Sequence, residues 1–163
     1  YKSILIFTST KRKVNGIVRS LKGKGYAVQG ISSDLEQAER EEVLLDFTTK
    51  KTRVLVATDV ISRGIDIKDI NLVINYDVPG NPADYVHRIG RTARADTKGA
   101  AITLINEEDM YKFRNIERLI EKSVEKLPLP EELGEAPEWK DKSPQKKKKR
   151  YYGKKKFYNK KKK

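Results

Sequence analysis

Residues 54–57 read Val-Leu-Val-Ala, an apolar run that ends abruptly in Thr58 and Asp59. Three similar runs occur at residues 4–7, 72–74 and 100–105. Continuous apolar runs are typical of strands buried on both faces, as in parallel sheets that are covered by helices. A weaker run at 26–29 is expected to form a further strand.

Helical patterns lie between these runs. The first is an apolar stripe with the i, i+3, i+4, i+7 spacing of an amphipathic helix, formed by Val14, Ile17, Val18 and Leu21. A second helix is expected to begin with Asp34 as its N-cap and Gln37 completing a capping box. Asn81 and Pro82 are expected at the N-cap and N1 positions of a third helix, and a fourth is expected over 110–120.

Strands that alternate with helices predict an α/β fold. In such folds the loops that follow parallel strands gather at one edge of the sheet, where ligands bind. Residues 8–11, 58–66 and 76–79 each follow an expected strand. The sequence therefore places three polar segments at the edge where this architecture binds ligands.

Two unusual strings fall in or after this region. Residues 57–66 read Ala-Thr-Asp-Val-Ile-Ser-Arg-Gly-Ile-Asp, and residues 87–94 read His-Arg-Ile-Gly-Arg-Thr-Ala-Arg. The second string holds an arginine at every third position, and arginine suits phosphate because it is always charged and presents a planar fork of donors. A row of arginines is more often a solvated helix face than a site. The second string therefore indicates a functional site only because the first string accompanies it.

Together these strings resemble motifs V and VI of the DEAD-box RNA helicases, a branch of the superfamily 2 ATPases. Residues 5–11 resemble motif IV, residues 37–40 the Gln-x-x-Arg motif, and residues 73–79 the strand and turn between motifs V and VI. The resemblance implies the C-terminal, second RecA-like domain of an ATP-dependent RNA helicase, most similar to the bacterial RhlE type. It implies a RecA-like parallel β-sheet flanked by helices on both faces.

The resemblance assigns roles to motif VI. Arg91 and Arg94 are expected to act as catalytic arginine fingers that also contact ATP, with structural ion pairs to nearby aspartates as the alternative. His87 and Arg88 are expected to contact the other domain. For Arg88 an internal brace is an equal alternative, and for His87 a plain surface position is the alternative.

Further roles follow from the other motifs. Gly64 and Asp66 are expected to bind ATP, with Asp66 at the ribose. RNA contacts are expected at Thr10, Lys11, Gln37, Arg40, Thr58 and Arg63. Ser33 replaces a glycine that is common in relatives, which puts one RNA contact in doubt. The capping box with Asp34 competes with RNA for Gln37.

The sequence holds no phosphate-binding loop of the form Gly-x-x-x-x-Gly-Lys-Ser/Thr and no Asp-Glu-Ala-Asp string. Gly25 and Gly30 have the spacing of the two glycines in that loop, but no lysine follows Gly30. We therefore expect half of an ATPase site, inactive alone, with Mg²⁺ held by a missing N-terminal RecA-like domain.

Composition divides the chain into three parts. The formal net charge is +13, but residues 146–163 hold twelve Lys/Arg and no acid, which leaves 24 basic and 23 acidic groups in residues 1–145. We expect the second RecA-like domain over 1–127, a proline-containing linker over 128–145 and a disordered, basic C-terminal tail over 146–163. Trp139 in the linker is expected to pack back on the domain.

The tail interleaves lysines with aromatic residues, a composition that favours single-stranded RNA because bases stack on rings while lysines follow phosphates. A solvated run without a partner is the alternative. The chain has no cysteine and one histidine, so we expect no metal site and a cytoplasmic location. No apolar run reaches membrane-spanning length, and no membrane partner is expected.

Two other function classes remain open from the sequence. One is an RNA-tethering or annealing module that acts through the tail without ATP chemistry. The other is a DNA-directed superfamily 2 motor. The physiological RNA, the unwinding polarity and the regulatory partners leave no signature in the sequence.

Overall fold

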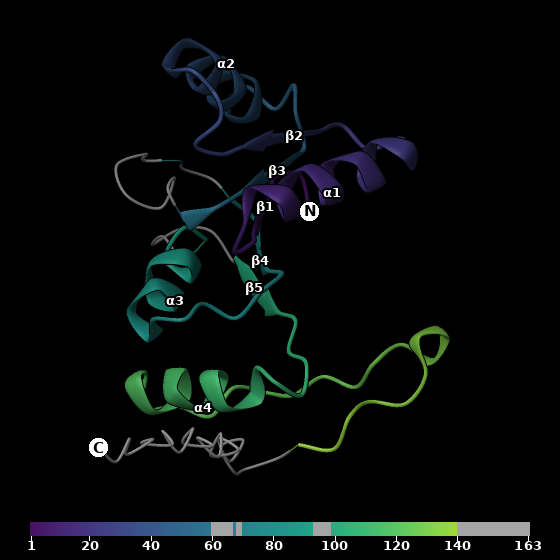
Figure 1. Ribbon diagram of the computed structural model, residues 1–163, viewed down its shortest axis with the longest axis vertical. Helices are drawn as coiled ribbons and strands as arrows, with labels where there is room; N and C mark the ends of the chain where they lie inside the picture. Colours follow the sequence, from purple (N-terminus) through teal and green to yellow (C-terminus); the bar gives the residue numbers. More distant parts are fainter. Residues whose placement is uncertain (60–66, 68–69, 93–98, 140–163) are drawn as a thin grey trace, which may run out of the picture.

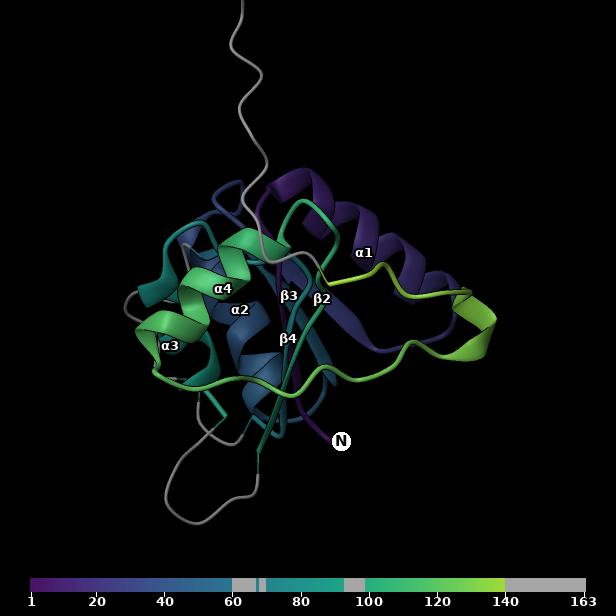
Figure 2. The same cartoon turned by 90° about the horizontal axis from the view of Figure 1, so that it is seen from below.

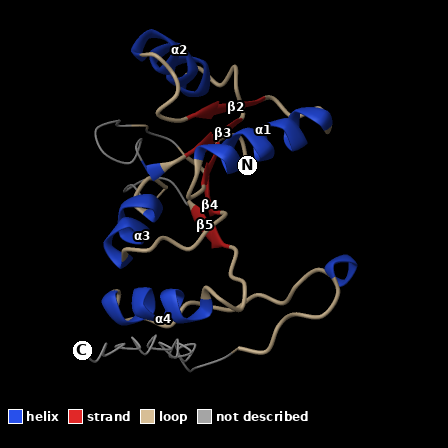
Figure 3. Cartoon of the chain, viewed as in Figure 1, coloured by secondary structure: helices blue, strands red, loops and turns tan. Residues whose placement is uncertain are grey.

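The computed structural model describes residues 1–59, 67, 70–92 and 99–139. Within these residues a parallel five-stranded sheet runs in the order β2-β3-β1-β4-β5. Its strands are β1 (Ile4–Phe7), β2 (Val28–Ile31), β3 (Val54–Ala57), β4 (Leu72–Asn75) and β5 (Ala100–Thr103). The first strand lies in the centre of the sheet and later strands are added on both sides of it (Figure 1); Figure 3 colours the strands red between the helices.

The helices are α1 (Lys11–Gly23), α2 (Gln37–Thr48), α3 (Pro82–Ile89) and α4 (Met110–Leu119). Figure 2 shows α1 on one side of the strands, with α2 and α3 on the other. This arrangement confirms the expected α/β, RecA-like fold with helices on both faces of a parallel sheet. Among the described residues, no helix combines the length and apolar character that crossing a membrane requires.

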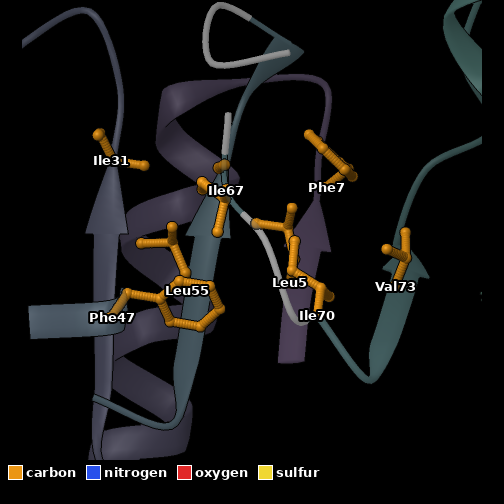
Figure 4. Packing of buried hydrophobic residues seen from close by; sticks show 9 residues of the cluster. Leu5, Phe7, Ile31, Phe47, Leu55, Ile67, Ile70 and Val73 are labelled. Carbon is orange, nitrogen blue, oxygen red and sulfur yellow. The ribbon is translucent and has the colours of Figure 1, made fainter. Parts of the chain in front are cut away.

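Alternate side chains of the strands form two separate cores. Val14 of α1 packs with Ile6, Val54 and Val56 on one face. On the opposite face Phe47 of α2 packs among strand and loop residues, shown in Figure 4: Leu5, Phe7, Ile31, Leu55, Ile67, Ile70 and Val73. The apolar runs of β1, β3 and β4 are explained, because each of these strands contributes to both cores. The run at β5 does not fit the expectation of burial on both faces, because this edge strand exposes Ala101 and Ile102.

Gly25 and Gly30, which have the glycine spacing of a phosphate-binding loop, have structural roles in this fold. Gly25 follows the C-cap of α1 with φ of +81°, and its amide donates to the carbonyl of Lys22 while Tyr26 donates to Leu21. This is the Schellman arrangement that ends helices. At Gly30 a Cβ atom would lie 2.8 Å from a methyl of Val14, so glycine lets α1 pack closely on β2.

Two local expectations were wrong. The strand expected at 26–29 is found at 28–31, because Gly30 belongs to the strand for the packing reason just given. The N-cap of α2 is Glu36 rather than Asp34, and its capping box is completed by Glu39 rather than Gln37. Glu36 stands three residues before Glu39, so the pair forms the same reciprocal box two residues later and satisfies the backbone amides of Glu36 and Glu39.

A third cluster joins α3, α4 and the following segment. Phe113 of α4 lies edge-on to Tyr85 of α3, with ring centroids 5.8 Å apart. Trp139 lies edge-on to the same Phe113 at 6.4 Å, and the ammonium of Lys126 lies 4.9 Å from the Trp139 ring centroid. The expectation that Trp139 packs back on the domain is confirmed. Along the chain, a short 3-10 turn (Glu131–Leu133) lies between Lys126 and Trp139.

Candidate functional site

Polar residues meet at the carboxyl edge of the sheet, as the strand order requires. Thr8 follows β1, Thr58 follows β3 and Tyr76 follows β4, and these three strands are neighbours. The amides of Thr8 and Tyr76 continue the ladder by donating to Ala57 and Phe7. The segments expected to carry function therefore begin from adjacent positions on one rigid edge.

Asp77 is the centre of the first network at this edge. Its carboxylate accepts hydrogen bonds from the Thr8 hydroxyl at 2.7 Å and from the Ser9 amide at 2.8 Å, and pairs with the Lys13 ammonium. Burial raises the pKa of Asp77, but these bonds from Lys13, Ser9 and Thr8 outweigh it and lower the pKa to about 2. Asp77 thus holds the loop between β1 and α1 against the end of β4.

Arg88 is the centre of the second network. Its guanidinium makes a bidentate pair with Asp59 at 2.7 and 2.8 Å and donates to the Asn75 side chain and the Asp77 carbonyl. It also lies 5.2 Å from the centroid of the Phe7 ring. Only 1% of the Arg88 residue surface is exposed, so α3 is fastened to the ends of β3 and β4.

An internal brace role is observed for Arg88, because its guanidinium is buried and bonded within its own domain. The expected contact of Arg88 with a second domain stays a prediction. Of the two roles left open by the sequence, the internal brace is the one observed. The neighbouring His87 is exposed, which leaves its expected contact with the other domain a prediction.

Arg91 lies just after α3 and is half-buried. The helix that leads to it begins as expected, with Asn81 accepting from the Ala83 amide at 3.0 Å and Pro82 at N1. The Thr92 hydroxyl then donates to the Ile70 carbonyl at 2.8 Å. A Cβ atom on Gly99 would lie 1.9 Å from the Thr92 hydroxyl oxygen, so glycine is required there.

The residues expected to contact RNA lie in two groups on exposed surface. Thr10 caps α1 by accepting from the Lys13 amide at 3.3 Å, and Lys11 pairs with Asp34 at 2.7 Å. On α2, the Gln37 side-chain amide donates to the Glu41 carboxylate at 2.7 Å. These contacts are all at the surface, so each side chain is accessible to solvent.

Arg40 links the second group to the loop after β2. Its guanidinium donates to the Ser33 carbonyl at 3.3 Å, while its buried Nε atom has no hydrogen-bond partner in the described part of the chain. Thr58 is half-buried at the end of β3. The predicted ligands Arg63, Gly64, Asp66 and Arg94 lie outside the described residues.

Sequence reasoning missed the residues that brace the site. Asp59, Asn75 and Asp77 were quoted within motifs but received no role. Their signal was available, because all three stand at the ends of neighbouring buried strands. Which of them would pair with Arg88 or Lys13 depends on contacts between segments far apart in the chain.

Comparisons with known proteins agree with this geometry. The family model described as the helicase conserved C-terminal domain matches residues 1–96. The chain is 42% identical over 124 residues to the ATP-dependent RNA helicase eIF4A of Eremothecium gossypii, which covers 76% of this chain and 31% of that protein.

Solved structures extend the agreement to three dimensions. The structure of the E. coli DEAD-box protein SrmB bound to the regulator RraA matches with a TM-score of 0.76 and 34% identity, covering 88% of this chain and 81% of that one. S. cerevisiae Dbp5 bound to RNA and ADP BeF3 matches with a TM-score of 0.66 and 36% identity, covering 71% and 32%.

The fold and these matches define a helicase C-terminal domain. Within that family, the chain belongs with the C-terminal domains of DEAD-box proteins. It spans about a third of the length of the eIF4A relative.

Proposed function

We propose that this chain is the second RecA-like domain of an ATP-dependent RNA helicase and serves ATP-coupled unwinding of RNA duplexes. The observation that carries the proposal is the Arg88–Asp59 pair, which fastens the helix of motif VI to the strand of motif V. The pair supports the proposal because it joins α3 firmly to the residues that follow β3. Such rigidity matters because small displacements of catalytic groups are costly in rate.

On the nucleotide side, Arg91 and Arg94 act as arginine fingers. Charge spreads over the phosphoryl oxygens during transfer, and a positioned guanidinium accelerates the reaction by about 10³–10⁵-fold. Gly64 and Asp66 contact the nucleotide, with Asp66 at the ribose. The first RecA-like domain supplies the phosphate-binding loop and holds Mg²⁺, and His87 contacts that domain.

On the RNA side, Thr10, Lys11, Gln37, Arg40, Thr58 and Arg63 contact phosphate and sugar. Such contacts position a strand without reading its sequence. The bond from the Arg40 guanidinium to the Ser33 carbonyl lies at the surface and supports this role, since it holds the guanidinium where a strand can reach it. The basic tail adds affinity for single-stranded RNA.

Three finer assignments belong to the same proposal. The lysine-rich end and short core favour a bacterial RhlE-type helicase, and the absence of cysteine suits the reducing cytoplasm. Because one half of the ATPase site is missing from these 163 residues, they hydrolyse no ATP by themselves.

The test is the ATPase rate of the full-length protein with RNA, with DNA and with neither. We expect stimulation by RNA alone, and no turnover above background from the 163-residue chain. Equal stimulation by DNA would favour a DNA-directed motor. Robust turnover by the 163-residue chain would refute the half-site.

A tethering or annealing protein is the second candidate, favoured by the concentration of charge in residues 146–163. Strand annealing that survives Arg94→Ala at the parent rate would support it. Annealing that depends on ATP and on Arg94 would exclude it.

A further inference from the structure

The charge of the folded domain is distributed unevenly over its helices. Helix α1 carries five basic residues and no acidic residue over Lys11–Gly23. The near-neutral balance of residues 1–145 therefore conceals a strongly basic element. This element begins at Thr10 and Lys11, directly at the proposed RNA site.

The basic residues of α1 are arranged as a stripe. Spacings of four, four and three residues place Lys11, Asn15, Arg19 and Lys22 on one side of the helix, with Arg12 beside them. All five side chains are exposed, whereas the apolar positions of α1 face the sheet. At about 1.5 Å per residue, the stripe is roughly 16 Å long.

The charges of the stripe are only partly neutralised. Lys11 pairs with Asp34, but no carboxylate in the described part of the chain pairs with Arg12, Arg19 or Lys22. Guanidinium groups without a carboxylate partner are available to phosphate. By contrast, Lys13 on the same helix is committed to Asp77.

Part of the stripe borders a hollow that is open to solvent. A space of about 440 Å³ is lined by Lys11, Arg12, Asn15, Gly16, Arg19 and Asp34. Gly16 lies in the middle of the helix, and a Cβ atom there would meet nothing within 4 Å. Glycine inside a helix is destabilising, and packing within the domain gives no reason for it. An approaching ligand does give one, because the missing side chain deepens the hollow between the two arginines.

We propose that the outer face of α1 is a second phosphate-binding track, on which RNA that leaves the motif IV contacts lies along Lys11, Arg12, Asn15, Arg19 and Lys22. The proposal rests on the proposed function and extends it beyond the motif residues. The stripe matches about five phosphates of a stacked strand, at roughly 3.4 Å per phosphate. An acidic protein segment is the competing partner, and the high basic charge and the adjoining RNA site favour nucleic acid.

The test compares two double variants of the whole 163-residue chain, both with the tail intact. Arg12→Gln/Arg19→Gln removes two charges from the stripe. Arg118→Gln/Lys122→Gln removes two exposed charges from α4 and the residues after it, at the far end of the molecule (Figure 1). Fluorescence anisotropy with oligouridine of about 30 nucleotides, long enough to span several sites, measures affinity over a salt series.

We expect the stripe variant to bind roughly tenfold more weakly at 0.1 M salt, with a salt slope smaller by about 1.4, because two phosphate contacts are lost. The control variant should change much less. Equal losses in both variants, or none in either, would overturn the proposal. So would a stripe variant that keeps its RNA affinity but loses binding to poly-glutamate, since the surface would then serve an acidic protein segment.

A single substitution guards against unfolding as the cause. Gly16→Glu places a carboxylate in the hollow and should weaken RNA binding. The same substitution should raise the melting temperature by a few degrees, because Glu is a better helix former than Gly. Unchanged affinity in this variant would contradict the track. If the full-length parent shows no RNA-stimulated ATPase, the proposed function itself fails, whatever the stripe variants do.

Discussion

The carboxyl edge of the sheet and the outer face of α1 use charge in opposite ways. At the edge, Asp77 and Arg88 are bonded to neighbours within the domain. On α1, Arg12 and Arg19 are exposed and form no ion pair among the described residues. The comparison teaches that a charged residue inside a functional motif can serve the fold, while Arg12 and Arg19, which lie outside every motif, form no ion pair among the described residues.

The sharpest test of this division lies within motif VI. In the full-length protein, Arg91→Ala should lower kcat by about 10³-fold or more, since a transition-state contact is lost. RNA affinity of the tail should stay at the parent level. Steady-state kinetics with saturating RNA measures the effect. A loss confined to KM would place Arg91 with the ground-state contacts instead.

Arg88→Met should lower the free energy of unfolding of the domain. Removing one partner of a fully buried pair destabilises a protein by about 3–5 kcal/mol, and we expect a smaller loss here because the Asp59 side chain that remains is 40% exposed and can be solvated. Urea unfolding of the 163-residue chain measures the change. Asp59→Asn completes a double-mutant cycle, and the contrast between Arg88 and Arg91 fails if the cycle shows no coupling.

Asp77 predicts a pH dependence. Its pKa is about 2 in the folded chain and about 3.9 when unfolded, so the folded state binds its proton less tightly. The resulting stability, on the order of 2 kcal/mol, is fully present above pH ~4 and is lost as the pH falls toward 2. Asp77→Asn should remove this portion of the acid sensitivity. Identical acid-unfolding curves for parent and variant would mean that the bonds of the Asp77 carboxylate to Lys13, Ser9 and Thr8 contribute nothing to this acid sensitivity.

Thr10 stands where the two regions join, and its substitution should have the smallest effect. Thr10→Ala removes the N-cap of α1 and should cost about 1 kcal/mol, while Thr10→Ser keeps the cap. Thermal melting compares the two variants. If both lose RNA affinity equally although only the alanine variant is less stable, Thr10 contacts RNA through its methyl group rather than its hydroxyl.

Local features were predictable from the sequence where local physics decides them. The strands at Ile4–Phe7 and Val54–Ala57 and the start of α3 at Asn81 were predicted to the residue, since apolar runs and capping residues act over short distances. The predicted start of α2 was wrong because Asp34 is a favoured N-cap residue and Glu36 is not, yet Glu36 takes the position with Glu39 completing its capping box. Only the structure decides between such neighbours.

Features that depend on long-range pairing were out of reach. The strand order follows from hydrogen bonds between segments as distant as β1 and β4. The partners of Arg88 come from the ends of two strands, and nothing in the local sequence tells which of the polar residues at these strand ends would pair with it. The sequence therefore predicted which segments lie together at one edge of the sheet. It did not predict which of their charged side chains are bonded within the domain and which are exposed.

Trp139 gives the molecule an optical reporter. It is the one tryptophan in the chain, and its ring lies against Phe113 and the ammonium of Lys126. Its fluorescence emission consequently originates from a single place, where the segment before the basic tail joins α4. A red shift that precedes loss of helical circular dichroism would show that this junction opens before the sheet unfolds.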